Sequence, residues 1–292
     1  SQGAIKGEIV LDPCANPIGL SQHNLGQHQG RFDLRDGGNF NRGFADLAEL
    51  VKDSLRPQLG PNSTDNTKEI RSALRAAAQG LHANNTVQDL KNTLLQLAVD
   101  ADIVLDLHCD TDAVMHVYAL TPQAEMAEQL GAALGAQAVL LATESGGTPF
   151  DEACSRPWLV MQELFPEFPV ELACFGATVE LRGEADTSHV LAKKDALALC
   201  DFLSSQGVLR QSSTIPSPLC SATPLSGSEP ITAPHAGVVV FHCTPGDVVV
   251  AGDLIADLVD AATGAITPLV CKSGGVLYGR CGQRWAQPGK RL

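Results

Sequence analysis

The chain contains three short stretches whose charged side chains could support chemistry. The first, residues 31–42, is rich in glycine and asparagine and carries Arg31, Arg35 and Arg42. Arginine presents a rigid fork of N–H donors that matches the two oxygens of a carboxylate. This stretch is therefore a candidate anion-binding loop, although its spacing alone favours an ordinary solvated loop.

The second stretch, Asp106-Leu107-His108-Cys109-Asp110, follows an apolar run of buried-strand length. Ligands of open α/β sheets bind outside the carboxyl ends of the strands. His108, preceded by a carboxylate that could orient its ring, has the composition of a metal ligand with its supporting residue. The alternative is a histidine bonded within the core. Cys109 is a poor nucleophile, because Asp106 and Asp110 would raise the pKa of its thiol.

The third stretch, residues 178–184, places Glu180 near the end of a predicted strand and just before a glycine-containing turn. A partly desolvated carboxylate at a strand end can have a raised pKa and can transfer protons. The alternatives are an edge-strand charge or an ion-pair partner for Arg182.

The elements that must position these stretches alternate between strands and helices. Predicted strands cover 7–11, 102–107, 114–120, 138–142 and 177–181, and predicted helices cover 45–55, 66–99 with a break near 80–85, 122–134, 158–165 and 188–203. This alternation predicts an α/β domain with a mixed, mostly parallel sheet flanked by helices.

The pattern changes after residue 207. We predict a catalytic domain over 1–207, a linker over 208–230 that is rich in Ser, Thr, Pro and Gly, and a small β-sandwich or barrel domain over 231–292. Short valine-rich runs separated by Gly-Asp turns indicate the last of these.

Composition narrows the possible partners. The 292 residues include 33 Asp and Glu against 20 Lys and Arg, a net charge of −13. This acidic excess argues against nucleic acid or an anionic membrane surface as the main partner. There is no apolar run of membrane-spanning length and no signal-peptide pattern at the first residues. Nine cysteines without a Cys-x-x-Cys pair favour reduced thiols and a cytoplasmic location.

The order of these motifs resembles the succinylglutamate desuccinylase/aspartoacylase family, a branch of the zinc-carboxypeptidase-like fold. The resemblance covers roughly residues 5–205 and rests on Asn16-Pro17, Asp36-Gly37-Gly38-Asn39-Phe40-Asn41-Arg42, Asp102-Ile103-Val104-Leu105-Asp106-Leu107-His108 and Val179-Glu180-Leu181. It implies a deacylase that cleaves the amide bond of an N-acyl amino acid, or a related ester, by means of zinc-activated water.

The resemblance also implies residue roles. One zinc ion per subunit would be held by a His-x-x-Glu motif and by a later histidine, which corresponds to His108. Glu180 corresponds to the general base. Asn41 and Arg42 would bind the carboxylate of a small-molecule substrate, with Arg31 or Arg35 as a further anion contact. Asp106 and Arg182 would contact the zinc ligand and the general base and help to orient them.

The sequence departs from the family in two places. Asn39 stands where the family usually has Asp, and no histidine of this chain is followed three residues later by Glu. We therefore expect the 292 residues to be an N-terminally incomplete part of a longer protein. The remaining zinc ligands would then lie upstream of residue 1, and this part alone would be inactive.

Two alternatives remain at this stage. One is a catalytically degenerate, metal-free protein that binds a small carboxylate on the same scaffold. The other is a zinc carboxypeptidase that acts on peptides. Under any of these interpretations a homo-oligomer is compatible with the sequence.

Overall fold

The computed structural model of the protein describes residues 4–292, which divide into two compact units. The helical unit contains residues 9–106 and 143–177, and the β-rich unit contains residues 4–8, 107–142 and 178–292. Within this described part, no helix is both long and apolar enough to cross a membrane.

A five-stranded sheet has the strand order β3-β7-β5-β6-β8. Its strands are β3 (Ile103–Asp110), β7 (Phe175–Gly183), β5 (Met115–Leu120), β6 (Ala138–Ala142) and β8 (Ala222–Pro224). The pairs β5–β6 and β6–β8 are parallel. Four of the five strands confirm predicted ones, and the mixed, mainly parallel α/β class predicted from the sequence is confirmed.

In the β-rich unit, helix α5 (Ala124–Leu134) packs against β5, β6 and helix α7 (His189–Ser205). The 3₁₀ turn Thr121–Gln123 precedes α5, and Gly135 ends it in the left-handed conformation, as is common at helix C-termini. Ser188 caps α7 by accepting a hydrogen bond from the amide of Leu191. These helices confirm the predicted segments 122–134 and 188–203.

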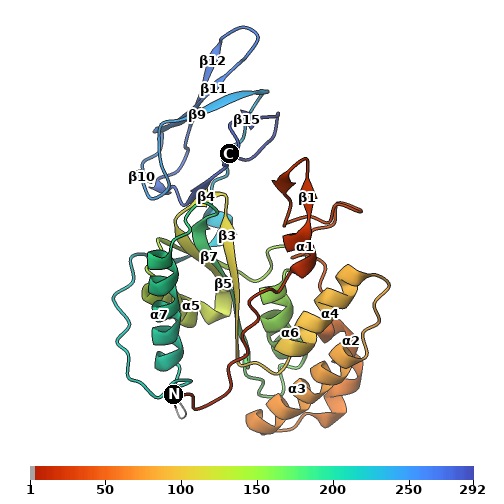
Figure 1. Cartoon of the computed structure of the whole chain (residues 1–292). Coiled ribbons are helices and arrows are strands. Elements are labelled where there is room, and N and C mark those ends of the chain that lie inside the picture. Colours follow the sequence, from red (N-terminus) through yellow and green to blue (C-terminus); the bar gives the residue numbers. More distant parts are fainter. Residues whose placement is uncertain (1–3) are drawn as a thin grey trace. The chain divides into compact units, whose positions relative to one another are not determined.

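The helical unit is built from four main helices, which Figure 1 shows gathered in one bundle. They are α2 (Leu47–Leu55), α3 (Ser63–Gln79), α4 (Thr86–Ala98) and α6 (Phe150–Leu164), accompanied by the short elements α1 (Pro17–Ser21), β1 (His23–Asn24), β2 (Gln27–His28) and the 3₁₀ turn Arg56–Gln58. Asp46, Asn62 and Asn85 cap α2, α3 and α4. Their buried faces enclose Trp158, which is 1% exposed.

Two sequence predictions in this region are wrong. Helix α6 begins at Phe150 and not near 158, since buried Cys154, Trp158 and Met161 form one apolar stripe that continues through Pro157. The predicted strand 7–11 is irregular and exposed, and Leu11 has an exposed fraction of 79%. No strand pairs with it within residues 4–292, so its apolar pattern lacks the hydrogen-bonding neighbour that a strand requires.

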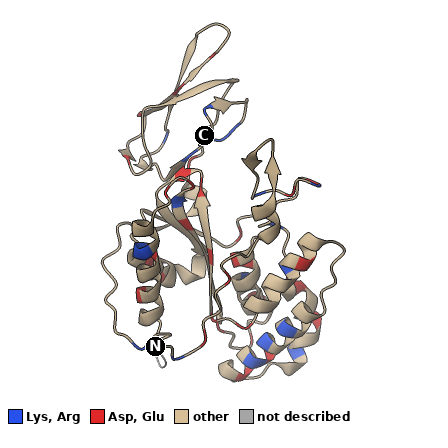
Figure 2. Ribbon diagram, viewed as in Figure 1, with Lys and Arg blue, Asp and Glu red and all other residues tan. Residues whose placement is uncertain are grey.

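Acidic and basic residues both occur along the helices of the helical unit, as the red and blue ribbon segments of Figure 2 show. Arg75 is bound to Asp100 at 2.6 Å, and Arg71 is bound to Asp102 at 2.9 Å. These are partly exposed ion pairs and contribute little to stability individually. Because Arg71 and Arg75 each have a carboxylate partner, their positive charges are neutralised locally.

The C-terminal part of the β-rich unit forms an antiparallel sheet with the order β12-β11-β9-β15. Its strands are β9 (Gly237–Phe241), β11 (Leu254–Val259), β12 (Ile266–Val270) and β15 (Trp285–Ala286), with β10 (Val248–Val249) paired to β13 (Gly275–Val276) nearby. A small core of Val239, Leu258 and Leu269 lies beneath it. The predicted domain limits at 207 and 230 stay a prediction.

A short antiparallel pair ties this C-terminal sheet region to the turn after β3. Strand β4 (Asp112–Ala113) pairs with β14 (Gly279–Arg280). Nε of Arg280 donates to Oδ2 of Asp112 at 2.6 Å, and the Thr111 hydroxyl donates to the Arg280 carbonyl at 3.0 Å. The C-terminal strands therefore brace the segment that directly follows His108 and Cys109 on β3.

Candidate active site

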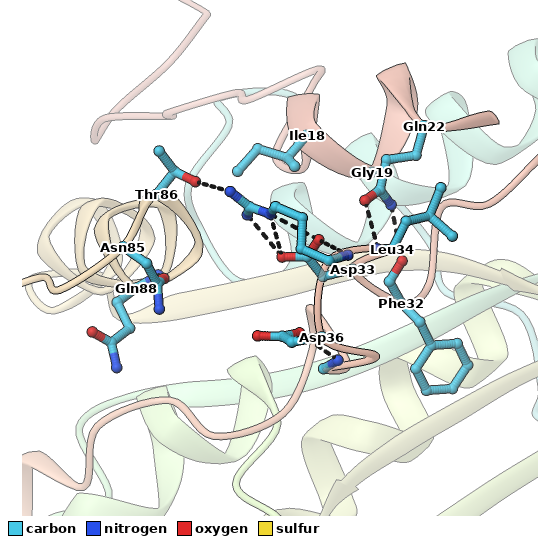
Figure 3. Close-up of polar contacts among 12 residues, drawn as sticks. Ile18, Gly19, Gln22, Phe32, Asp33, Leu34, Asp36, Asn85, Thr86 and Gln88 are labelled. Carbon is cyan, nitrogen blue, oxygen red and sulfur yellow. Dashed lines mark hydrogen bonds and ion pairs between the residues drawn. The ribbon is translucent and has the colours of Figure 1, made fainter. Parts of the chain in front are cut away.

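In the helical unit, side-chain hydrogen bonds order the polar stretch that leads into the arginine loop. Oδ1 of Asn16 accepts from the Gly19 amide at 2.8 Å, and its Nδ2 donates to the Gly30 carbonyl at 3.1 Å. The Gln22 side chain donates to the Phe32 carbonyl and accepts from the Leu34 amide, as Figure 3 shows. These side-chain amides form hydrogen bonds with backbone groups that have no strand or helix partner in this irregular stretch.

Arg35 is bound to residues of its own unit. Its Nε and Nη2 donate to the buried Asp33 carboxylate at 2.7–3.0 Å, and its Nη1 donates to the Thr86 hydroxyl at 2.9 Å (Figure 3). These hydrogen bonds to Arg35 hold the pKa of Asp33 below its usual value. Because all three nitrogens are engaged, Arg35 ties the loop to helix α4. Its predicted contact with substrate stays a prediction.

Asn41 joins three segments of the helical unit. Its Nδ2 donates to Oδ2 of Asp106 at 3.1 Å, and its Oδ1 accepts from the Phe150 amide at 2.9 Å. The Asn41 amide in turn donates to Oδ1 of Asn39 at 2.9 Å. An asparagine oxygen at position 39 thus accepts the bond that an aspartate oxygen could accept. The departure from the family pattern preserves this turn.

Arg42 keeps more of its donors free than Arg35 does. Its Nη1 donates to the Asn41 carbonyl at 2.6 Å, and the side chain is half-buried. It forms no ion pair with any residue in the range 4–292. Arg31 lies over the ring of Phe32, with its Cζ 5.7 Å from the ring centroid. Of the three predicted arginines, Arg35 is fully engaged, whereas half-buried Arg42 and exposed Arg31 both keep guanidinium donors that could bind a carboxylate.

Lys91 of α4 supports the same loop and was not among the residues selected from the sequence. Its Nζ donates to the Arg42 carbonyl at 2.5 Å and to the Asn39 carbonyl at 3.4 Å. It also lies 5.8 Å from the centroid of the Phe44 ring. Burial lowers the pKa of Lys91. No local motif marks this lysine, since its partners are about 50 residues away in sequence.

The β-rich unit contains His108 on β3 and Glu180 on β7, both half-buried. The Glu184 amide donates to the Asp110 carbonyl at 2.7 Å, which ties the turn after β7 to the end of β3. Burial raises the pKa of the Cys109 thiol, and the Glu180, Glu184 and Asp110 charges raise it further. The thiolate is therefore disfavoured, as expected for a cysteine that is not a nucleophile.

Arg182 is held by a carboxylate on helix α7. Its Nη2 donates to Oδ2 of Asp195 at 2.5 Å and its Nη1 to Oδ1 at 3.3 Å, and the two side chains are 18% and 10% exposed. The backbone of Arg182 has φ +69°, a left-handed conformation that is uncommon for a residue other than glycine. Arg182 thus fixes the strand two residues beyond Glu180, and Asp195 was missed by sequence reasoning.

The described residues do not fit a complete zinc site. Over residues 4–292, no three His, Cys, Asp or Glu side chains come together in a way that could hold a metal ion. A catalytic zinc site normally has three protein ligands. Of the ligands that the family resemblance implies, the described residues include only the predicted His108.

Comparison with known proteins identifies solved structures that share this fold. No protein-family model and no curated protein matches this sequence. Among solved structures, a protein of Shewanella amazonensis assigned to the succinylglutamate desuccinylase/aspartoacylase family is 25% identical, with a TM-score of 0.82 over 96% of this chain and 78% of that one. The structural relatives of this chain are succinylglutamate desuccinylase/aspartoacylase family proteins. The resemblance predicted from the motifs is confirmed.

Two further structures agree. A desuccinylase/aspartoacylase of Shewanella frigidimarina is 22% identical, with a TM-score of 0.82 over 96% of this chain and 77% of that one. A succinylglutamate desuccinylase of a Silicibacter species is 19% identical, with a TM-score of 0.59 over 90% and 68% of the two chains. At these identities the two structures show the desuccinylase/aspartoacylase fold alone.

Proposed function

We propose that this protein is a deacylase that hydrolyses the amide bond of an N-acyl amino acid, or a related ester, to a carboxylate and a free amine or alcohol. The observation that carries the proposal is the likeness to the Shewanella amazonensis protein over 96% of this chain. The motifs that suggested the family include Arg42 and Glu180, which supply the two chemical groups that such a reaction needs: an anion ligand and a proton carrier.

In this proposal Arg42 binds the substrate carboxylate, which its free guanidinium donors support. Glu180 takes a proton from the attacking water and passes it to the leaving nitrogen as the C–N bond breaks. Its half-buried position on β7 supports that role, because partial burial strengthens its interaction with a nearby proton donor. Zinc dependence is part of the proposal, with His108 as one ligand.

The test is hydrolysis of N-acetyl-L-aspartate, N-succinyl-L-glutamate and short peptides by the full-length gene product, with metal analysis of the same sample. Glu180→Gln is expected to lower kcat about 10²–10⁴-fold with bound zinc retained. Glu184→Gln is the matched control, since it removes an exposed carboxylate from the next turn. A wild-type rate in Glu180→Gln contradicts the role of Glu180, and cleavage of peptides alone favours the carboxypeptidase alternative.

A second candidate function is binding of a small carboxylate without hydrolysis. It is favoured by the completeness of the Arg42 loop, whose supports Lys91, Asn39 and Asn41 all lie in the helical unit. Zinc-free full-length protein that is stabilised by N-acetyl-L-aspartate, yet releases no amine, would establish this function. Stoichiometric zinc together with turnover would rule it out.

A further inference from the structure

The side chain of Arg42 lies against the loop that precedes helix α6. A Cβ atom built on Gly147 would lie 3.0 Å from Cδ of Arg42 and 3.7 Å from its Cγ and Nε. Carbon atoms in contact are ordinarily about 3.5–4.0 Å apart. A side chain at position 147 would therefore require the aliphatic part of Arg42 to move by a few tenths of an ångström or more.

Hydrogen bonds hold the two loops at this distance. The Gly43 amide donates to the Gly147 carbonyl at 2.7 Å, and the Phe44 amide donates to the Thr148 carbonyl at 3.3 Å. The hydrogen bond from the Phe150 amide to Oδ1 of Asn41 also joins these two loops. Since bonds flank Arg42 on both sides, the loops cannot separate to admit a larger residue without breaking them.

The loop around Gly147 is also conformationally unusual. Gly146, Gly147 and Thr148 have φ values of +93°, +74° and +48°. A β-branched residue such as threonine is a clear outlier in this region. A strained backbone conformation of this kind persists only where surrounding contacts hold it in place, and it is frequent at ligand sites. The Ser145 amide, which donates to the buried Glu152 carboxylate at 2.6 Å, is one such constraint.

We propose that Gly147 is a positioning residue for substrate binding: its missing side chain lets Arg42 lie on the loop backbone, which fixes the conformation from which the guanidinium binds the substrate carboxylate. This inference rests on the proposed role of Arg42. It adds that the selectivity of the site for a carboxylate depends on a residue that makes no polar contact with the ligand. In this role the missing side chain of Gly147, and not a polar contact with the ligand, sets the position of Arg42.

The test compares Gly147→Ala with Gly146→Ala. Both positions have positive φ, so alanine is strained at both, but a Cβ on Gly146 would have no described atom within 4 Å. We expect Gly147→Ala to weaken binding of N-acetyl-L-aspartate about tenfold or more relative to Gly146→Ala, as misplacement of a binding group does. Titration calorimetry of the full-length protein measures this, with N-acetyl-L-alaninamide as the ligand without a carboxylate.

The same pair of variants in an Arg42→Ala background completes a double-mutant cycle. The difference in Tm between Gly147→Ala and Gly146→Ala should disappear when Arg42 is absent, because the contact that distinguishes the two positions is then gone. Equal affinities for the two alanine variants, with binding lost in Arg42→Ala, would overturn the role of Gly147 alone. Unchanged affinity in Arg42→Ala would overturn the proposed role of Arg42 as well.

The test remains informative if the Gly147→Ala variant fails to fold. A Gly147→Ala protein that unfolds with Arg42 present and folds in the Arg42→Ala background supports the contact. A Gly147→Ala protein that fails to fold in both backgrounds, while Gly146→Ala folds, shows that the loop needs glycine for its own conformation. That result would overturn the inference.

Discussion

A buried histidine is expected to make the stability of this protein depend on pH. His116 of β5 is 0% exposed, and its ring lies 5.3 Å from the rings of Tyr118 and Tyr278. Its Nδ1 is 2.8 Å from the Val114 carbonyl oxygen, which requires a hydrogen on Nδ1. Its Nε2 has no hydrogen-bond partner among the described residues. A proton added at Nε2 would be a buried, unbonded donor on a charged ring.

The direction of the pH effect follows from this geometry. Burial lowers the pKa of His116 below its ordinary 6.5, and the Val114 bond and the Asp110 charge oppose that shift without reversing it. As the pH falls below 6.5, the unfolded chain binds a proton that the native protein does not bind. The free energy of unfolding therefore decreases with falling pH, by at most about 1.4 kcal/mol per pH unit for one proton.

Urea denaturation between about pH 5 and about pH 7 measures this slope above the range in which most carboxylates titrate. The unaltered protein should lose up to about 2 kcal/mol through His116 on going from about pH 6.5 to about pH 5. His116→Asn keeps a donor near the Val114 carbonyl and should remove this part of the slope. His189→Asn is the matched control, because His189 is exposed. An unchanged slope in His116→Asn would refute the reasoning.

Two further variants test the supports of the candidate site. Lys91→Met removes the hydrogen bonds from this lysine to the Arg42 and Asn39 carbonyls. It should destabilise the helical unit by about 2 kcal/mol, the contribution of hydrogen bonds to a charged group, and it should weaken N-acetyl-L-aspartate binding. An unchanged urea midpoint and an unchanged Kd would contradict the role of these bonds. Asp195→Ala should cost about 3 kcal/mol, because it leaves Arg182 buried without its carboxylate. Adding Arg182→Gly should recover part of this loss in urea denaturation, and a fully additive loss would show that the pair is not coupled.

Much of the architecture follows from local sequence. Short runs of strand-forming residues correctly predicted β5, β6 and β7, and the break at 80–85 correctly separated α3 from α4. Short-range signals of this kind depend on residues within one or two turns of each other. The predicted strand 7–11 failed because a strand needs a partner that local sequence does not supply.

The sequence by itself determined the fold class, the family resemblance and which residue types could bind an anion or carry a proton. Only the tertiary structure decided which arginine is engaged, since the guanidinium of Arg35 is bound to Asp33 and Thr86 whereas that of Arg42 donates only to the Asn41 carbonyl among the described residues. It alone revealed Lys91 and Gly147, whose contacts join segments about 50 and about 100 residues apart in the chain. The physical reason is that availability of a side chain depends on what surrounds it, and most of its neighbours come from distant parts of the sequence.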